Sequence, residues 1–226
     1  MSDYFYWNKK ILEDLSDSNI IEYFNNGYLF TRESKGSIYQ TRSLRVNLDH
    51  FELTSENKRI LNKTPDLTFK IINLPISLDN YDWNIHKLGK DFYQNKLHLE
   101  KAFSSNKLKE LLTSSNKSNF NSLMEFSVSS EIMGYAICYI NKDIFQYAYP
   151  FYKYQKFANN YGMGMMLRAI IYAKDNGLKN IYLGSVTRET DLYKLQFKGL
   201  EWYDENSWQT EKLEELKQVI NNFSKI

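Results

Sequence analysis

The sequence predicts an α/β fold, a mixed sheet flanked by helices, from three observations. The segment Ile144–Tyr154 is aromatic and β-prone, and the glycine-containing run Asn159–Gly164 follows it. Apolar residues then recur at helical spacing as far as Gly177, and Asn180–Gly184 has the composition of a short buried strand. Finally, the chain has 18 Tyr and 14 Phe but only 3 Pro, a composition typical of a compact protein that contains strands.

The first third of the chain predicts one helix and several strands. A short amphipathic helix is expected over Asn19–Asn26, ended by Gly27. Tyr28–Thr31 and Ser37–Thr41 are β-prone and flank a polar, turn-rich stretch, which is typical of a hairpin. Alternation of polar and apolar residues over Ser43–Phe51 predicts a further strand.

The middle and the end of the chain alternate between strand and helix patterns. The predicted strands are Asp66–Pro75, Leu123–Val128 and Gly134–Ile140. The predicted helices are two within Lys96–Thr113, broken at Ser104–Asn106, and an amphipathic one over Thr210–Phe223. Ser114–Asn121 has the most linker-like composition of the chain, so we expect two lobes, residues 1–115 and 120–226.

Composition limits the classes of protein to consider. A net charge of +2 with 25% charged residues is neither that of a disordered tail nor that of a strongly basic nucleic-acid coat. The lone Cys138 excludes an intramolecular disulfide, and His50, His86 and His98 lack ligand-like spacing, so we expect no metal site. No apolar run approaches the roughly 18 residues of a membrane span, and the N-terminus lacks a signal-peptide pattern, which predicts a cytoplasmic protein.

A strand, a glycine loop and a helix N-terminus together make an anion-binding device, because backbone N–H groups and the helix dipole both attract negative charge. The spacing of the glycines in Asn159–Gly164 matches neither the dinucleotide fingerprint nor a phosphate-binding P-loop. A tight strand-to-helix connection without a ligand is the alternative. The candidate donor-binding residues are Asn159, Asn160, Tyr161, Gly162, Met163 and Gly164.

The same run resembles motif A of the GNAT acyltransferases, Gln/Arg-x-x-Gly-x-Gly/Ala, with Asn159 in the first place and Gly162 and Gly164 as the glycines. Downstream, Asp191–Phe197 resembles the GNAT helix in which a tyrosine often faces the acyl group. The resemblance implies a GNAT-like, mostly antiparallel sheet with an N-terminal β-rich lobe. It makes Tyr193 the candidate catalytic residue, as a proton donor or as a hydrogen-bond donor to the acyl carbonyl, with core packing as the alternative.

Most of the chain, roughly residues 20–208, also resembles the arginyl/leucyl-tRNA–protein transferases. Several pieces match that family in the right order, among them Gly27-Tyr-Leu-Phe, Leu44-Arg-Val, Ala173-Lys-Asp-Asn-Gly-Leu, Ile181-Tyr-Leu-Gly, and Tyr193-Lys194 with Phe197. The family's cysteine cluster is missing, since Tyr39–Leu44 simply bridges the gap. The family's Lys-Met and its later proline are also replaced, by Thr190-Asp191 and Gly199, which puts the acceptor specificity in doubt.

A basic run in the N-terminal half matches the polar-basic segments of that family. Arg42, Arg45, Lys58 and Arg59 are the candidate tRNA-binding residues, because phosphate contacts need such clusters. Acidic residues are interleaved with them, so a solvated surface of mixed charge is the alternative.

The resemblance implies an aminoacyl-tRNA-dependent acyltransferase that moves an amino acid from charged tRNA to an amine, such as a protein or peptide N-terminus. Charged tRNA is then a co-substrate, and no further cofactor is expected. Two alternatives are an acetyl-CoA-dependent N-acetyltransferase and a non-catalytic RNA-binding or adaptor protein.

Overall fold

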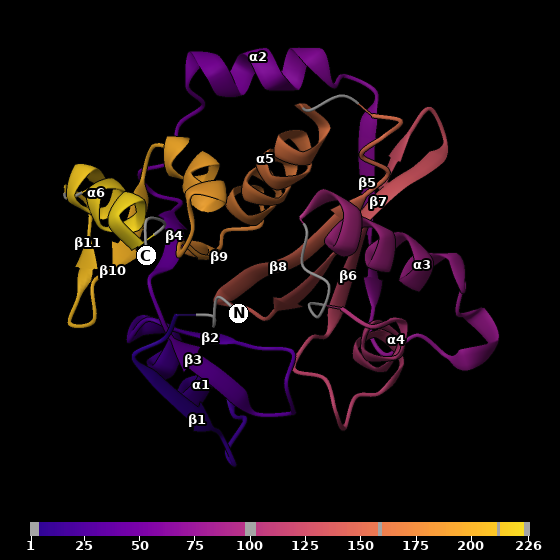
Figure 1. Cartoon of the computed structure of the whole chain (residues 1–226), viewed down its shortest axis with the longest axis horizontal. Helices are drawn as coiled ribbons and strands as arrows, with labels where there is room; N and C mark the ends of the chain where they lie inside the picture. Colours follow the sequence, from indigo (N-terminus) through magenta and orange to yellow (C-terminus); the bar gives the residue numbers. More distant parts are fainter. Residues whose placement is uncertain (1–4, 98–102, 158–159, 212, 224–226) are drawn as a thin grey trace. The chain divides into compact units, whose positions relative to one another are not determined.

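The computed structural model describes residues 5–97, 103–157, 160–211 and 213–223 of the chain (Figure 1). Its residues divide into two compact units. The first unit comprises Met1–Thr54, Asn141–Gln146 and Tyr172–Ile226, and the second comprises Ser55–Ile140 and Tyr147–Ile171. Each unit is therefore built from separate segments of the chain. The lobes 1–115 and 120–226 stay a prediction.

The N-terminal part of the first unit is a small antiparallel sheet with one helix. Its elements are β1 (Asn8–Ile11), α1 (Asp17–Asn25), β2 (Tyr28–Phe30) and β3 (Ser37–Gln40), and the strand order is β1-β3-β2. The α1 helix and the β2–β3 hairpin confirm the sequence predictions. Gly27 follows α1 with a φ of +76°, a left-handed conformation that glycine adopts without strain. A Cβ there would also meet the ring of Tyr203 at 2.1 Å.

A larger sheet runs through the first unit, with its strands in the order β11-β10-β4-β9-β8. They are β4 (Ser43–Asn47), β8 (Ile144–Tyr152), β9 (Asn180–Ser185), β10 (Leu200–Tyr203) and β11 (Trp208–Gln209). The β8–β9 pair is parallel and covers Ile144–Gln146 and Asn180–Tyr182, whereas the other pairs are antiparallel. The buried Gln146 side chain exchanges two hydrogen bonds with the backbone of Phe30, at 3.1 and 3.0 Å, and so ties β8 to β2.

In the second unit the sheet continues from β8 through β7 and β6 to β5, giving eight strands in all. The added strands are β5 (Leu67–Asn73), β6 (Ser122–Val128) and β7 (Glu131–Ile140), and the β5–β6 and β6–β7 pairs are antiparallel. The fold is thus the expected α/β one, with a large, mostly antiparallel sheet. Cys138 is fully buried in β7.

The helices complete both units. They are α2 (Ser55–Lys63), η1 (Leu78–Asn80), α3 (Asn84–Asp91), the π-helical turn η2 (Phe92–Lys96), α4 (Ser105–Thr113), α5 (Asn160–Asp175), η3 (Glu189–Gln196) and α6 (Leu213–Phe223). The side chain of Ser104 accepts a hydrogen bond from the Lys107 backbone at 3.1 Å and caps α4, which explains the predicted break at this serine. The predicted helix before that break lies partly outside the described residues.

Two helices were not expected from the sequence. The polar run that begins at Ser55 forms α2, which buries Asn57 and Ile60 on one face. The second, α3, buries Ile85 and Gly89. A Cβ on Gly89 would lie 2.4 Å from the Leu108 side chain, so α3 packs closely on α4 at this glycine.

Candidate functional site

The predicted glycine loop is the first part of a helix. Helix α5 begins at Asn160, so Tyr161, Gly162, Met163 and Gly164 lie in its first turns, and Asn159 lies outside the described residues. Glycine lowers helix propensity, which is why this run resembles a loop in the sequence. The positive end of the α5 dipole lies where the motif predicted a donor-binding site, and the binding of a donor there stays a prediction.

Both glycines of the motif face protein atoms. A Cβ on Gly162 would lie 2.8 Å from Tyr152 Oη, and a Cβ on Gly164 would lie 3.0 Å from Thr64 Oγ1 and 3.1 Å from Leu67. Close packing of α5 therefore accounts for the missing side chains. The approach of a ligand to the backbone is not needed to explain them.

One of the predicted basic residues lies beside the start of α5. The guanidinium of Arg59 in α2 donates to Asn160 Oδ1 at 3.5 Å and forms a two-bond ion pair with Glu56 at 2.6 and 2.7 Å. Lys58, the neighbouring residue, is exposed. The structure thus brings together Arg59 and Asn160, two residues 101 positions apart in the sequence.

Arg168 fixes α2 against α5. Its Nε donates to the carbonyl of Leu67 at 2.6 Å, Nη1 donates to Thr64 Oγ1 at 3.1 Å, and Nη2 donates to the carbonyl of Thr64. These acceptors lie just past the C-terminus of α2, where a cation is favoured by the helix dipole. Because Arg168 anchors the end of α2, the position of Arg59 at the start of α5 is set by the fold.

Asp66 adds a carboxylate to the same region. It accepts a hydrogen bond from the hydroxyl of Tyr161 at 3.2 Å, and this bond, together with burial as the larger cause, raises the pKa of that tyrosine. The start of α5 therefore lies beside Arg59, which is paired with Glu56, and beside the carboxylate of Asp66. The N-terminus of a helix favours an anion, and that is the chemistry the motif predicted here.

Tyr193, the predicted catalytic residue, lies in the first unit on η3. Its side chain is 46% exposed, so it is not a core residue. The turn that carries it is held by Asp191, which accepts hydrogen bonds from the backbone N–H groups of Thr187 and Arg188, both at 3.1 Å. Lys194 donates to Asp191 at 3.2 Å and to the carbonyl of Ser185 at 2.9 Å.

No role for Asp191 was predicted from the sequence. Burial alone would raise the pKa of its carboxyl, but the charges of Lys194 and Arg188, with the N–H of Thr187, bring the pKa below its usual value. The ionised carboxylate therefore fixes η3 and presents the Tyr193 hydroxyl to solvent in a defined place. Lys194 is itself largely buried and bound to Asp191.

The other two basic candidates are engaged in the interior of the first unit. The guanidinium of Arg42 lies 4.0 Å over the ring of Phe5, and only 6% of this arginine is exposed. Arg45 donates to Glu201 at 2.6 Å and lies 4.0 Å over the ring of Trp208. Neither side chain has the exposure expected of a tRNA contact.

The described residues contain neither a metal-binding group nor a membrane-spanning helix. Within these residues, no group of three or more His, Cys, Asp or Glu side chains is placed to hold a metal ion. No helix in this part of the chain has both the length and the apolar character needed to cross a membrane. His98 lies outside the described residues.

A family model described as "Arginine-tRNA-protein transferase, C terminus" matches residues 87–204, more than half of the chain. No curated protein matches the chain.

Among solved structures, the chain is similar to L-PGS from Bacillus licheniformis, with a TM-score of 0.48 and 15% identity over 91% of this chain and 56% of that one. It is also similar to the C-terminal domain of a putative lysylphosphatidylglycerol synthetase from Agrobacterium fabrum, with a TM-score of 0.47 and 11% identity over 79% of this chain and 55% of that one. The chain thus spans a little over half the length of these two structures.

Proposed function

Because the chain belongs to the arginine-tRNA–protein transferase family through its C-terminal domain, we propose that it transfers an amino acid from charged tRNA to an amine, such as the N-terminus of a protein or peptide. The match of the family model over residues 87–204 is the observation that carries this proposal. In this reaction the amine nitrogen attacks the ester carbonyl of the aminoacyl-tRNA. The tetrahedral intermediate then collapses to an amide and releases the ribose hydroxyl.

The chain's own residues supply positioning and proton transfer in this proposal. The first-turn N–H groups of α5 and the guanidinium of Arg59 bind a phosphate near the 3′ end of the tRNA. Tyr193 donates its proton to the leaving ribose oxygen and regains one, by way of solvent, from the positively charged nitrogen of the tetrahedral intermediate. Its exposure supports this role, because an exposed hydroxyl can reach a substrate.

We expect the change Tyr193→Phe to lower kcat at least 100-fold, since a positioned general acid contributes about 10²–10⁴-fold. The thermal midpoint should stay within about 1 °C of that of the wild type, because the hydroxyl is exposed. Single-turnover transfer of a labelled amino acid to a peptide measures the first quantity, and a calorimetric scan measures the second. An unchanged kcat would remove Tyr193 from the mechanism.

Incubation with a panel of labelled aminoacyl-tRNAs and peptides of differing N-terminal residue, beside labelled acetyl-CoA, tests the function. Label should pass from a charged tRNA to a peptide, and an excess of coenzyme A should not compete. An acetyl-CoA-dependent N-acetyltransferase is the second candidate, because the same α5 amides suit a pyrophosphate. Saturable binding of coenzyme A together with acetyl transfer would establish that reaction instead. Binding of tRNA without transfer from any donor would favour the adaptor alternative.

A further inference from the structure

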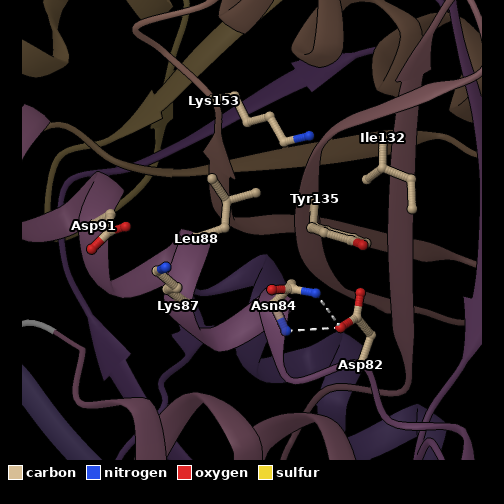
Figure 2. Close-up of a pocket in the computed structure, with 8 residues that line it drawn as sticks. All are labelled: Asp82, Asn84, Lys87, Leu88, Asp91, Ile132, Tyr135 and Lys153. Carbon is tan, nitrogen blue, oxygen red and sulfur yellow. Dashed lines mark hydrogen bonds between the residues drawn. The ribbon is translucent and has the colours of Figure 1, made fainter.

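The second unit contains a cleft whose residues have been given no role above. It consists of two adjoining hollows of about 360 and 580 Å³, which share Asp82, Ile132 and Tyr135 in their lining. This is the size range of small-molecule sites. Figure 2 shows residues that line the first hollow, among them Tyr135 of β7, Asp82 and Leu88 of α3.

Tyr135 lines both hollows and is almost completely buried, with 3% of its surface exposed. Its ring packs on Phe151, and no hydrogen bond joins its hydroxyl to another of the described residues. Burial, followed by the charges of Glu125 and Asp82, raises the pKa of Tyr135, so the hydroxyl stays neutral at physiological pH. A hydroxyl at a cleft that forms no hydrogen bond within the described fold can accept one from a ligand and donate one to it.

Glu125 lies directly opposite Tyr135 in the β6–β7 pair and is itself 9% exposed. Its ion-pair partner is Lys70, at 2.9 Å, the residue opposite it in β5. The side chain of Lys70 is 66% exposed, so this lysine neutralises the buried carboxylate from the solvent side. A long, exposed lysine is readily exchanged for another cation, because holding it in place costs conformational entropy.

Asp82 contributes the third oxygen-bearing group. Its Oδ1 accepts hydrogen bonds from the backbone and the side chain of Asn84 at 2.8 and 2.9 Å, at the start of α3. Figure 2 shows its other carboxylate oxygen pointing toward the hydroxyl of Tyr135. Two carboxylates and a neutral hydroxyl thus line the second hollow, and the apolar side chains of Ile72 and Ile132 contribute to its walls.

The balance of charge differs between the two hollows. The first is lined by two lysines, Lys87 and Lys153, and by the carboxylates of Asp82 and Asp91. Lys153 also pairs with Glu131 at 3.0 Å. The lining of the second hollow has the two carboxylates of Asp82 and Glu125 against the single charge of Lys70. The second hollow is therefore the part of the cleft that suits a cation.

We propose that this cleft binds the primary ammonium group of the acceptor, with Glu125 and Asp82 balancing its charge and the Tyr135 hydroxyl accepting one of its hydrogen bonds. An ammonium has three donors and needs acceptors that are charged or strongly polar. The identification of the ligand as an acceptor rests on the proposed function, whereas the binding of an ammonium group does not. A peptide α-amine and a lysine side chain offer the same group, so both are tested.

The test measures binding without tRNA, by calorimetry or by chemical-shift changes, so its result does not depend on turnover. The probes are a short peptide with a free α-amine, its N-acetylated twin, and an N-acetylated twin that carries one lysine. The wild type should bind at least one of the two ammonium-bearing peptides and bind the acetylated twin at least tenfold more weakly. Equal binding of all three peptides would overturn the proposal, even if transfer activity is found.

Three variants and a control sharpen this test. Tyr135→Phe and Glu125→Gln should each weaken peptide binding at least tenfold, because a hydrogen bond or ion pair to a charged group is removed. Lys70→Met should strengthen binding severalfold, because it removes the competing cation. The control Glu110→Gln removes a carboxylate of α4 that pairs with two lysines outside the cleft, and it should leave binding unchanged.

Tyr135→Phe is the decisive variant, because its hydroxyl forms no hydrogen bond within the described part of the fold. Its thermal midpoint should therefore equal or exceed that of the wild type. Wild-type affinity in a folded Tyr135→Phe protein would overturn the proposed role of the hydroxyl. Weaker binding in that variant beside tighter binding in Lys70→Met would establish the site. Failure of transfer with intact ammonium binding would overturn only the proposed function.

Discussion

Two pairs of basic residues, both candidates for tRNA binding from the sequence, have different surroundings in the two units. Arg42 and Arg45 in the first unit are largely buried, and each guanidinium lies 4.0 Å over an aromatic ring. Lys58 and Arg59 in the second unit are exposed on α2, with Arg59 beside the start of α5. The first pair stabilises the fold, whereas the second pair is exposed, with Arg59 paired to Glu56. A basic residue type alone does not distinguish these two roles.

Removal of Arg45 should have the largest effect on stability. Arg45→Met removes the ion pair of the buried Glu201, and the hydrogen bond from Asn47 Nδ2 at 3.2 Å remains. Because a buried charge without an ion-pair partner is costly, the free energy of unfolding should fall by about 3 kcal/mol. Denaturant titration of this variant measures the change. Arg59→Met is the matched control, because its ion pair with Glu56 is half-exposed and screened by solvent, so its loss should leave the free energy of unfolding nearly unchanged. Equal effects in both variants would contradict the distinction between the buried and the exposed pair.

The sequence predicted the strands more completely than the functional surface. Alternating or aromatic patterns located β2 to β9, because burial of one or both faces of a strand leaves a local signature. The helix α2 was missed, since its run Ser55–Arg59 is polar and only Asn57 and Ile60 are buried. An amphipathic pattern is hard to detect when so little of a helix faces the core.

The site was less predictable, because its parts come from distant segments. The two glycines drew attention to the start of α5 as a proposed anion-binding site, but the contact of Asn160 with Arg59 depends on how α2 packs. The cleft proposed to bind an ammonium group had one local signal, the single acidic residue Glu125 in a strand of apolar residues and serines. Its pairing with Tyr135 follows from the strand register, which depends on the packing of the whole sheet rather than on local sequence.

Substitution of Gly162, at the start of α5, should have an effect of intermediate size on stability if this glycine is needed for packing rather than for ligand binding. Gly162→Val should lower the free energy of unfolding by about 2 kcal/mol, because the new side chain meets the ring and hydroxyl of Tyr152. In a Tyr152→Ala background the same change should cost less than about 1 kcal/mol. A double-mutant cycle measures this coupling. If the valine costs the same in both backgrounds, packing against Tyr152 does not explain the glycine.

The smallest effect on stability is expected for the exposed pair, Lys58 and Arg59. Replacing both residues is also the most direct test of the difference between the two basic pairs. Lys58→Gln with Arg59→Gln should change the free energy of unfolding by less than about 0.5 kcal/mol, because both side chains are exposed. Binding of tRNA should weaken, and the slope of log affinity against log salt should become shallower by roughly one to two, one for each phosphate that no longer meets a cation. Filter binding at several salt concentrations measures both quantities. The control Lys107→Gln with Lys117→Gln removes two lysines that pair with Glu110, away from the start of α5, and should leave the slope unchanged. If both double variants make the slope shallower by the same amount, tRNA binding depends only on the net charge of the protein. The position of Arg59 beside Asn160 then has no part in tRNA binding.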